Sequence, residues 1–204
     1  MTRKMNLAIF IIVSLLVASC FTLKFPFFTK PVKTSDNSTQ INVKSLKVWH
    51  VGSGNDILDK VLDKLQQLGC NKIEHLEVQE LLMSESFDFN ESFLIIFDGN
   101  WISERVDDPE LHKLFREVAY KGVKLVAIGG KTSKLLEALD KAGLNKLARD
   151  DAGNIRNPAY FDPTLVGFKL VETYTSEGHL HTYPSILISN TTNINTLVQE
   201  LINW

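Results

Sequence analysis

The sequence predicts an α/β domain: a three-layer, doubly wound and mostly parallel sheet over residues 46–204, preceded by a hydrophobic N-terminal helix. Three observations predict it. Short apolar runs alternate with stretches in which apolar residues recur at helical spacing. Glycine-containing turns separate these runs. Such alternation with short connections is typical of βαβ units, which build a parallel sheet covered by helices on both faces.

Residues 1–23 are predicted to be a signal peptide or a membrane anchor. Arg3 and Lys4 precede an uncharged stretch over residues 5–23, which is the layout of a secretory signal. The stretch contains Val-Ala-Ser-Cys at residues 17–20, which resembles the bacterial lipobox and makes Cys20 a candidate for lipidation. An uncleaved anchor is the alternative, because a helix of this length covers about 28 Å, close to the hydrocarbon thickness of a bilayer. Either form tethers the following domain to a membrane.

Residues 24–45 are predicted to form a flexible stalk, since most of this segment is polar and rich in Ser, Thr, Asn and Pro. The signal-like layout favours export, so we expect the domain on the extracytoplasmic face. Lys24, Lys30 and Lys33 lie beyond the apolar stretch and outnumber the two basic residues before it. The positive-inside rule therefore leaves the orientation open.

The charge of the chain is divided unevenly. Residues 1–45 hold six basic residues and one acidic residue, a charge of +5, and the whole chain has −2, so the remainder carries −7. An acidic domain argues against a general nucleic-acid partner, because phosphate contacts need clustered Lys and Arg. Two cysteines exclude a disulfide scaffold, and a hydrophobic fraction of 44% excludes a mostly disordered chain. No cofactor is expected.

The first half of the domain predicts three strands and one helix. The strands lie at residues 46–51, 73–78 and 93–97, and the third is apolar throughout, as expected of a strand that is buried on both faces. A helix is predicted over residues 56–68. Asn55 or Asp56 can cap its start and Gly69 can end it.

The second half begins with a clear helix start at Asp108-Pro109-Glu110, which combines a cap, a proline in the first turn and an acid near the positive helix end. A strand follows at residues 123–128, and Leu135, Leu136 and Leu139 predict another helix. The region 148–163 is polar and turn-rich. Two strands at 168–174 and 185–189, joined by a loop, and a closing helix at 193–204 complete the domain.

About 100 residues of this pattern resemble the class I glutamine amidotransferase-like group, taken broadly with its flavodoxin-like three-layer relatives. The matching pieces are the strand and turn at 93–99, the helix that starts at Pro109, the strand and turn at 123–130, and the helix start at 135–136. In that group the sharp turn after the strand carries a nucleophilic cysteine. The corresponding position here is Gly129, and no His-Glu or His-Asp pair follows. The resemblance therefore implies the fold without the amidotransferase chemistry, which needs an activated nucleophile beside a base.

The candidate site lies at the carboxyl ends of the predicted strands, where open parallel sheets bind ligands. Asp98, at the end of a buried strand, is the best single candidate for a functional carboxylate, and its alternative role is to cap a turn. The turn after the first strand opens a helix, so its amides are placed to bind an anion. The candidate ligand-binding residues are Gly52, Ser53, Gly54, Asn55, Asp98, Asn100, Gly129 and Gly130.

Two functions follow from these residues. The first is a non-catalytic binding or interaction module, held at the membrane through its N-terminus, with an unknown protein or small-molecule ligand. The alternative is a metal-assisted hydrolase that uses Asp98 together with His50, His179 or His181. His179 and His181 are two residues apart, so in an extended segment they face the same side, as metal ligands can.

Overall fold

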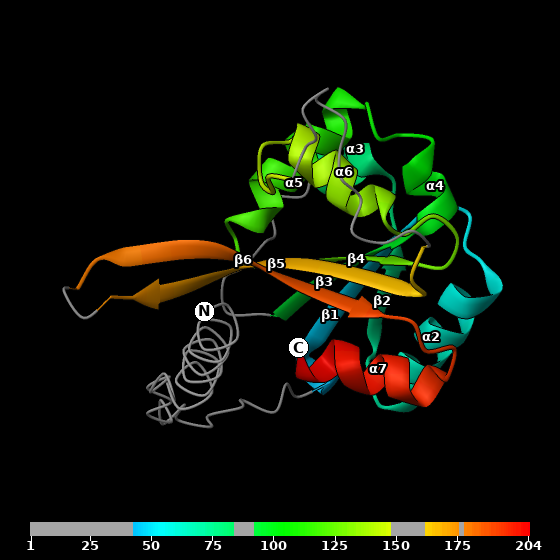
Figure 1. The fold of residues 1–204 in the computed structure, drawn as a ribbon. Helices are drawn as coiled ribbons and strands as arrows, with labels where there is room; N and C mark the ends of the chain where they lie inside the picture. The colour runs from blue at the N-terminus through cyan, green and yellow to red at the C-terminus, as the bar shows by residue number, and fades with distance from the viewer. Residues whose placement is uncertain (1–42, 84–91, 148–161, 176–177) are drawn as a thin grey trace, which may run out of the picture. The chain divides into compact units, whose positions relative to one another are not determined.

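Within the described residues, six strands form one sheet in the order β2-β1-β3-β4-β5-β6 (Figure 1). The structure is a computed structural model that describes residues 43–83, 92–147, 162–175 and 178–204. Neighbouring strands from β2 to β4 run parallel, and β4, β5 and β6 pair antiparallel. The predicted α/β class with a mostly parallel sheet is confirmed. The strands are β1 (Leu46–Val51), β2 (Lys72–His75), β3 (Ser92–Asp98), β4 (Lys124–Ile128), β5 (Leu165–Tyr174) and β6 (Leu180–Ser189).

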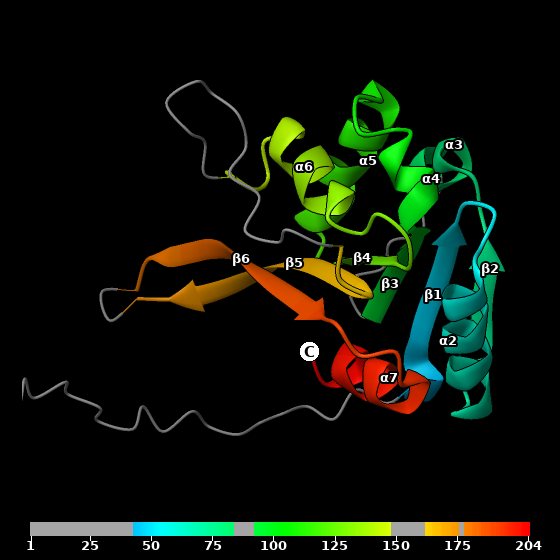
Figure 2. The same cartoon turned by 45° about the vertical axis from the view of Figure 1, so that its right-hand side comes forward.

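Helices cover both faces of this sheet, and each face has its own apolar core (Figure 2). The first core contains Phe97, Phe115 and Phe168. The second contains Leu58, Ile96 and Leu201. On the first face lie α3 (Val78–Met83), α4 (Gly99–Ser103), α5 (Pro109–Ala119) and α6 (Lys134–Lys141). On the second lie α2 (Asp56–Gln67) and α7 (Ile194–Asn203), and a short 3-10 turn, η1 (Val43–Ser45), leads into β1.

The helix starts follow from local sequence. The Asn55 side chain accepts hydrogen bonds from the backbone amides of the first turn of α2, and Asp108 caps α5 with Pro109 in its first turn. Asn193 caps α7 in the same way. A cap satisfies amides that have no partner inside the helix, which is why these starts are predictable from sequence.

Two helices and several strand ends differ from the prediction. Leu76 to Val78 does not continue the second strand, and α3 begins at Val78 instead. The turn after β3 is the short helix α4. Both helices have fewer than two full turns, so they show too little periodicity to be recognised from sequence. The strands β5 and β6 are longer than predicted, with ten residues each.

The direction in which the chain adds strands to the sheet reverses between β1 and β3. From β1 it passes through α2 to the edge strand β2, then crosses back to β3 on the other side of β1, and continues outward to β4. Connections leave the two central strands on opposite faces, which makes their carboxyl ends a topological switch point. This is the edge of the sheet to which the sequence assigns the candidate site.

The strands β5 and β6 form a hairpin that extends beyond the body of the domain (Figure 1). Its base is buried against both cores through Leu165 and Phe168, whereas residues 172–175 and 178–184 are exposed. The exposed apolar side chains of this hairpin are Tyr174, Leu180, Tyr183, Ile186 and Ile188. We call residues 170–186 the arm.

The predicted tether lies outside the described residues, and so do Cys20 and almost all of the predicted stalk. Within the part of the chain that the structure describes, no helix is long and apolar enough to cross a membrane. The second cysteine, Cys70, is fully buried in the second core, as the sequence predicts for a small apolar group. Burial raises the pKa of its thiol, so this cysteine is not a reactive thiolate in the folded domain.

Candidate functional site

Three turns meet at the carboxyl edge of the sheet, and they contain the eight residues that the sequence singles out. They follow β1, β3 and β4, which are neighbours in the sheet. Asn55 Nδ2, in the first turn, donates a hydrogen bond of 2.9 Å to the carbonyl oxygen of Ile128 at the end of β4. This bond joins segments 73 residues apart. Asn55 and the end of β4 therefore lie together at the edge where the sequence places the candidate site.

Asp98 is 2% exposed and uses its carboxylate to cap α4. Its Oδ1 accepts hydrogen bonds from the backbone amides of Asn100 at 2.7 Å and of Trp101 at 3.3 Å. Capping is the alternative role that the sequence allowed for this residue. The two bonds hold Oδ1 against the first turn of α4, so this oxygen has a structural role.

Close backbone packing fills the space between the turns. A β-carbon on Gly52 would lie 2.8 Å from the β-carbon of Trp101, and one on Gly99 would collide with the carbonyl oxygen of Gly129. A β-carbon on Gly130 would likewise collide with the Asn100 side chain. The glycines at this edge thus allow segments to touch, and in these places they do not outline a hollow for a ligand.

Gly129 occupies the position at which the amidotransferase-like group carries its nucleophile. Its backbone is left-handed, with φ of 69°, and it lies directly against Asn55. A β-carbon at Gly129 would come 2.5 Å from Asn55 Oδ1. A cysteine or serine therefore has no room here unless Asn55 moves, and moving Asn55 breaks both the cap of α2 and the bond to Ile128.

A histidine pair next to the switch point was not predicted. His50 on β1 and His75 on β2 are in register, and their ring centroids are 4.7 Å apart. His75 Nε2 lies 3.1 Å from the carbonyl oxygen of Gly52. The sequence pointed to His50 but not to His75, because the register of β1 and β2 depends on pairing that no local pattern encodes.

Burial lowers the pKa of His50, the nearby His75 lowers it further, and Asp59 opposes both effects. His50 is therefore mainly uncharged at neutral pH. Its Nδ1 atom is buried and has no hydrogen-bond partner among the described residues. A buried nitrogen without a hydrogen bond lowers the free energy of unfolding. In the histidine pair, His50 Nδ1 is such an atom.

His179 and His181 lie far from Asp98. Ser189, the last residue of β6, pairs with Leu165, which pairs with Ile128 at the carboxyl edge. His181 is eight positions earlier in β6, which places it about 26 Å along the strand at the usual rise of about 3.3 Å per residue. The geometry does not support a site that combines these histidines with Asp98. Among the described residues, no group of three or more His, Cys, Asp or Glu side chains could hold a metal ion.

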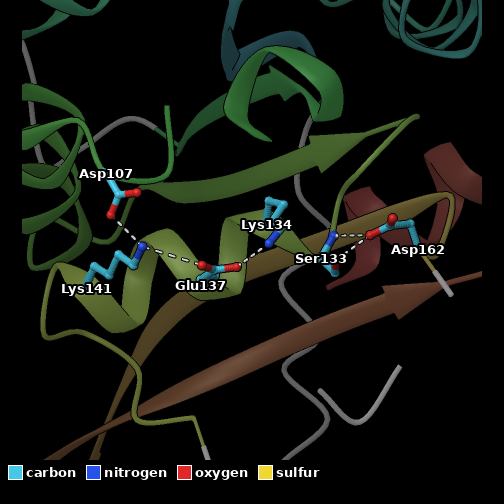
Figure 3. Close-up of polar contacts among 6 residues, drawn as sticks. All are labelled: Asp107, Ser133, Lys134, Glu137, Lys141 and Asp162. Atoms are coloured by element: carbon cyan, nitrogen blue, oxygen red, sulfur yellow. Dashed lines mark hydrogen bonds and ion pairs between the residues drawn. The ribbon is translucent and has the colours of Figure 1, made fainter. Parts of the chain in front are cut away.

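Polar contacts support the turn after β4 from outside (Figure 3). Ser133 donates from its backbone amide and its hydroxyl to Asp162 Oδ1. Along α6, Lys134 pairs with Glu137 at 2.6 Å, and Lys141 pairs with Asp107 at 2.5 Å (Figure 3). Lys141 lowers the pKa of Asp107 and Asp107 raises that of Lys141, as expected of an ion pair. These contacts hold α6 and the residues before it in place.

The described surface has a hollow beside the arm, at a distance from the carboxyl edge. A hollow of about 420 Å³ lies between the end of α5 and the hairpin, and its lining residues include Tyr120, Leu170, Glu172 and Thr182. The sequence missed this hollow, because it arises from the packing of a helix end against a hairpin far away in the chain. Comparisons with protein-family models, with curated proteins and with solved structures found no match.

Proposed function

We propose that this chain is a membrane-tethered, extracytoplasmic α/β domain that acts as a non-catalytic binding or interaction module, with the fold of the amidotransferase-like group but without its nucleophile. The hydrophobic segment at residues 5–23 supports the tether. Lipidation at Cys20 and an uncleaved membrane helix are the two forms that this tether can take. The ligand or partner protein is defined so far only by the surfaces that the domain offers.

The observation that carries the proposal is the packing around Gly129. Amidotransferase-type catalysis needs a nucleophilic side chain at that position, with a base beside it. Here a β-carbon would lie 2.5 Å from Asn55 Oδ1. Asp98, the other group that could do chemistry at this edge, is buried and caps α4.

The arm supports an interaction role. Apolar side chains as large as Tyr174 and Leu180 are 77% and 48% exposed there. Tyr174 is in register with Leu180, so these two side chains adjoin, and adjoining exposed apolar side chains are a common mark of a protein interaction site. The hairpin of β5 and β6 also projects beyond the helices of the first face (Figure 2).

The tether is tested by treating intact cells and spheroplasts with protease. We expect the chain to be membrane-bound and its domain to be cleaved by the external protease without lysis of the cells. A domain that resists external protease until the cells are lysed would contradict the extracytoplasmic assignment. Loss of residues 1–23 should release the domain from the membrane fraction, and retention there would contradict the tether.

The binding role is tested by photo-crosslinking in native membranes. A photoreactive phenylalanine derivative replaces Tyr174 on the arm, and in a control chain it replaces Met83, which is 79% exposed and lies on α3. A discrete crosslinked product from position 174 but not from position 83 is expected. Equal products from both positions would contradict a specific role for the arm. Stoichiometric zinc or manganese in the purified full chain, measured by elemental analysis, would favour the hydrolase instead.

A further inference from the structure

The strand β6 forms one end of the described sheet, and its outer side pairs with no other described strand (Figure 1). We call this outer side the β6 edge. The strand has ten residues, Leu180–Ser189, whereas β2 at the other end of the sheet has four, Lys72–His75. An unpaired edge presents a row of backbone N–H and C=O groups to which another strand can bind. The β6 edge is the longer of the two rows that the described sheet presents.

Hydrogen bonds at both ends of the hairpin show which residues of β6 face outward. The amide of Gly129 donates to the carbonyl oxygen of Thr164 at 2.9 Å, so the even-numbered residues of β5 face β4 and the odd-numbered ones face β6. At the other end, the amide of Thr175 donates to the carbonyl oxygen of His179 at 2.8 Å, which agrees. The register of β5 and β6 has no break, so the backbone groups of the even-numbered residues of β6 point outward. They are Leu180, Thr182, Pro184, Ile186 and Ile188.

Pro184 divides the β6 edge into two parts. Proline has no backbone N–H, and because position 184 faces outward, no bond to β5 is lost there. A strand added along the edge would nevertheless find no donor at this point. After Pro184, both Ile186 and Ile188 keep an outward N–H and C=O, and no hydrogen bond from another described residue reaches them.

The part of the β6 edge after Pro184 lacks the features that usually protect an edge strand. Edge strands are commonly short or carry charged side chains, as β2 does with Lys72 and Glu74. Residues 180–189 contain no Asp, Glu, Lys or Arg. Ile186 and Ile188 are 41% and 51% exposed. Exposed β-branched side chains on an uncharged edge favour pairing with another strand.

This part of the edge is also complementary to itself. A two-fold axis at Leu187 would place Ile186 of one copy opposite Ile188 of a second copy, in antiparallel pairs that exchange both of their N–H···O bonds. Leu187 would lie opposite itself, and no charged side chain of β6 would face a like charge. Pro184 would lie opposite Asn190, beyond the end of β6, so the paired strands need no donor from the proline.

We propose that the β6 edge joins two copies of this chain by antiparallel pairing of residues 185–189, so that one sheet continues across both domains. Both copies use the same edge in a two-fold pair, which leaves no free β6 edge, and assembly therefore ends at a dimer. Pairing covers Ile186 and Ile188, which the single domain exposes. The interface goes beyond the function proposed above, because it uses neither the tether nor the tip of the arm.

The first test measures the mass of the full chain in detergent by sedimentation over a range of concentrations. Ile186→Pro removes an outward N–H without removing a bond to β5, as Pro184 does in the natural strand. Thr182→Pro makes the same change at an outward position before Pro184, outside the paired segment, and is the matched control. We expect a dimer for the parent chain and for Thr182→Pro, and dimerisation weakened by about tenfold or more for Ile186→Pro.

A second variant guards against misfolding of Ile186→Pro. Ile188→Lys places a charge on a half-exposed position of the same edge, and it should weaken the dimer to a similar extent. Circular dichroism checks that each variant is folded. A monomeric parent chain would overturn the proposal, and so would a dimer that is equally strong in the parent and in folded Ile186→Pro and Ile188→Lys. Association through the N-terminal segment would give that second result.

The second test locates the two-fold axis with disulfides in the full chain. In the proposed register the α-carbons of Leu187→Cys in two copies lie about 4.5 Å apart, within the range that a disulfide spans. Those of Tyr183→Cys are eight positions out of register, about 26 Å apart, which makes this variant the control. Mild oxidation followed by mass spectrometry should find a disulfide between two copies at position 187 and none at position 183.

A disulfide at position 183 but not at 187 would overturn the proposed pairing. The outcome is separate from that of the function proposed above, because photo-crosslinking at Tyr174 tests the arm at a position outside the paired segment. A monomeric chain that still crosslinks a partner through Tyr174 would contradict the β6 interface alone.

Discussion

At the scale of single residues, glycine and asparagine decide the character of the carboxyl edge. Gly129 has a left-handed backbone and touches Asn55, whose side chain both caps α2 and binds the end of β4. One asparagine thus joins a local role with a tertiary one. The local role is visible in the sequence, because Asn precedes a helical pattern. The tertiary role depends on the strand order, which places β4 next to β3 and one strand away from β1.

Gly129→Ala should destabilise the domain more than Gly143→Ala does. Both glycines have left-handed backbones, with φ of 69° and 79°, and each substitution costs about 1–2 kcal/mol for that reason. At Gly129 the new β-carbon also contacts Asn55. At Gly143 nothing lies within 4 Å of the new β-carbon. Urea unfolding should show an additional loss of at least about 1 kcal/mol for Gly129→Ala. Equal losses would show that Asn55 moves away without cost.

His50 should make stability depend on pH. Its pKa in the folded domain is lowered from 6.5, mainly by burial, so the unfolded chain binds its proton more readily. The free energy of unfolding is therefore complete above about pH 6.5 and falls as pH decreases from there towards the folded pKa. His50→Gln should flatten this part of the profile in urea unfolding at a series of pH values. A slope equal to that of the parent chain would show that His50 is not its source.

At the scale of elements, long periodic segments were predictable and short ones were not. The helices α2, α5 and α7 have clear caps and apolar faces. Both ends of α2 and α7 were predicted within one residue, and so was the start of α5. α3 and α4 were missed because five or six residues do not establish a period. The first residues of β6 were missed because residues 180–184 are exposed, so no apolar alternation marks them. The prediction for β5 missed only residues 165–167, which are buried at the base of the hairpin.

The hairpin of β5 and β6 should tolerate substitution near the tip of the arm but not at its own buried base. Phe168 is fully buried in the first core, and Phe168→Ala should cost about 3–5 kcal/mol. Tyr174 is 77% exposed, and Tyr174→Ala should change stability by no more than about 0.5 kcal/mol. Urea unfolding of the two variants checks both values. A large loss for Tyr174→Ala would mean that the tip contributes to the folded core, and the case for a free interaction surface would weaken.

At the scale of the described domain, a single sheet joins two cores. Each central strand contributes to both cores, as Ile95 and Ile96 do in β3. Because the strands are shared, a helical layer that loses its packing exposes one face of the same strands whose other face forms the second core.

The two cores should therefore unfold together. Cys70 belongs to the second core and Trp101 packs against the first. Pulse labelling of the Cys70 thiol, located by mass spectrometry, and fluorescence in a chain that retains Trp101 as its sole tryptophan should give the same urea midpoint. Separate midpoints would show that one helical layer detaches first.

The sequence by itself determined the alternation of strands and helices, the main helix caps, the buried third strand and the hydrophobic segment that predicts a tether. Each of these depends on residues within a few positions of one another, so periodicity and capping chemistry suffice to find them. Only the tertiary structure decided that Asn55 closes the space beside Gly129, that His50 faces His75 and that Lys124 lies beside Lys169. These pairs depend on the order and register of strands, which arise when distant segments bury their apolar faces together.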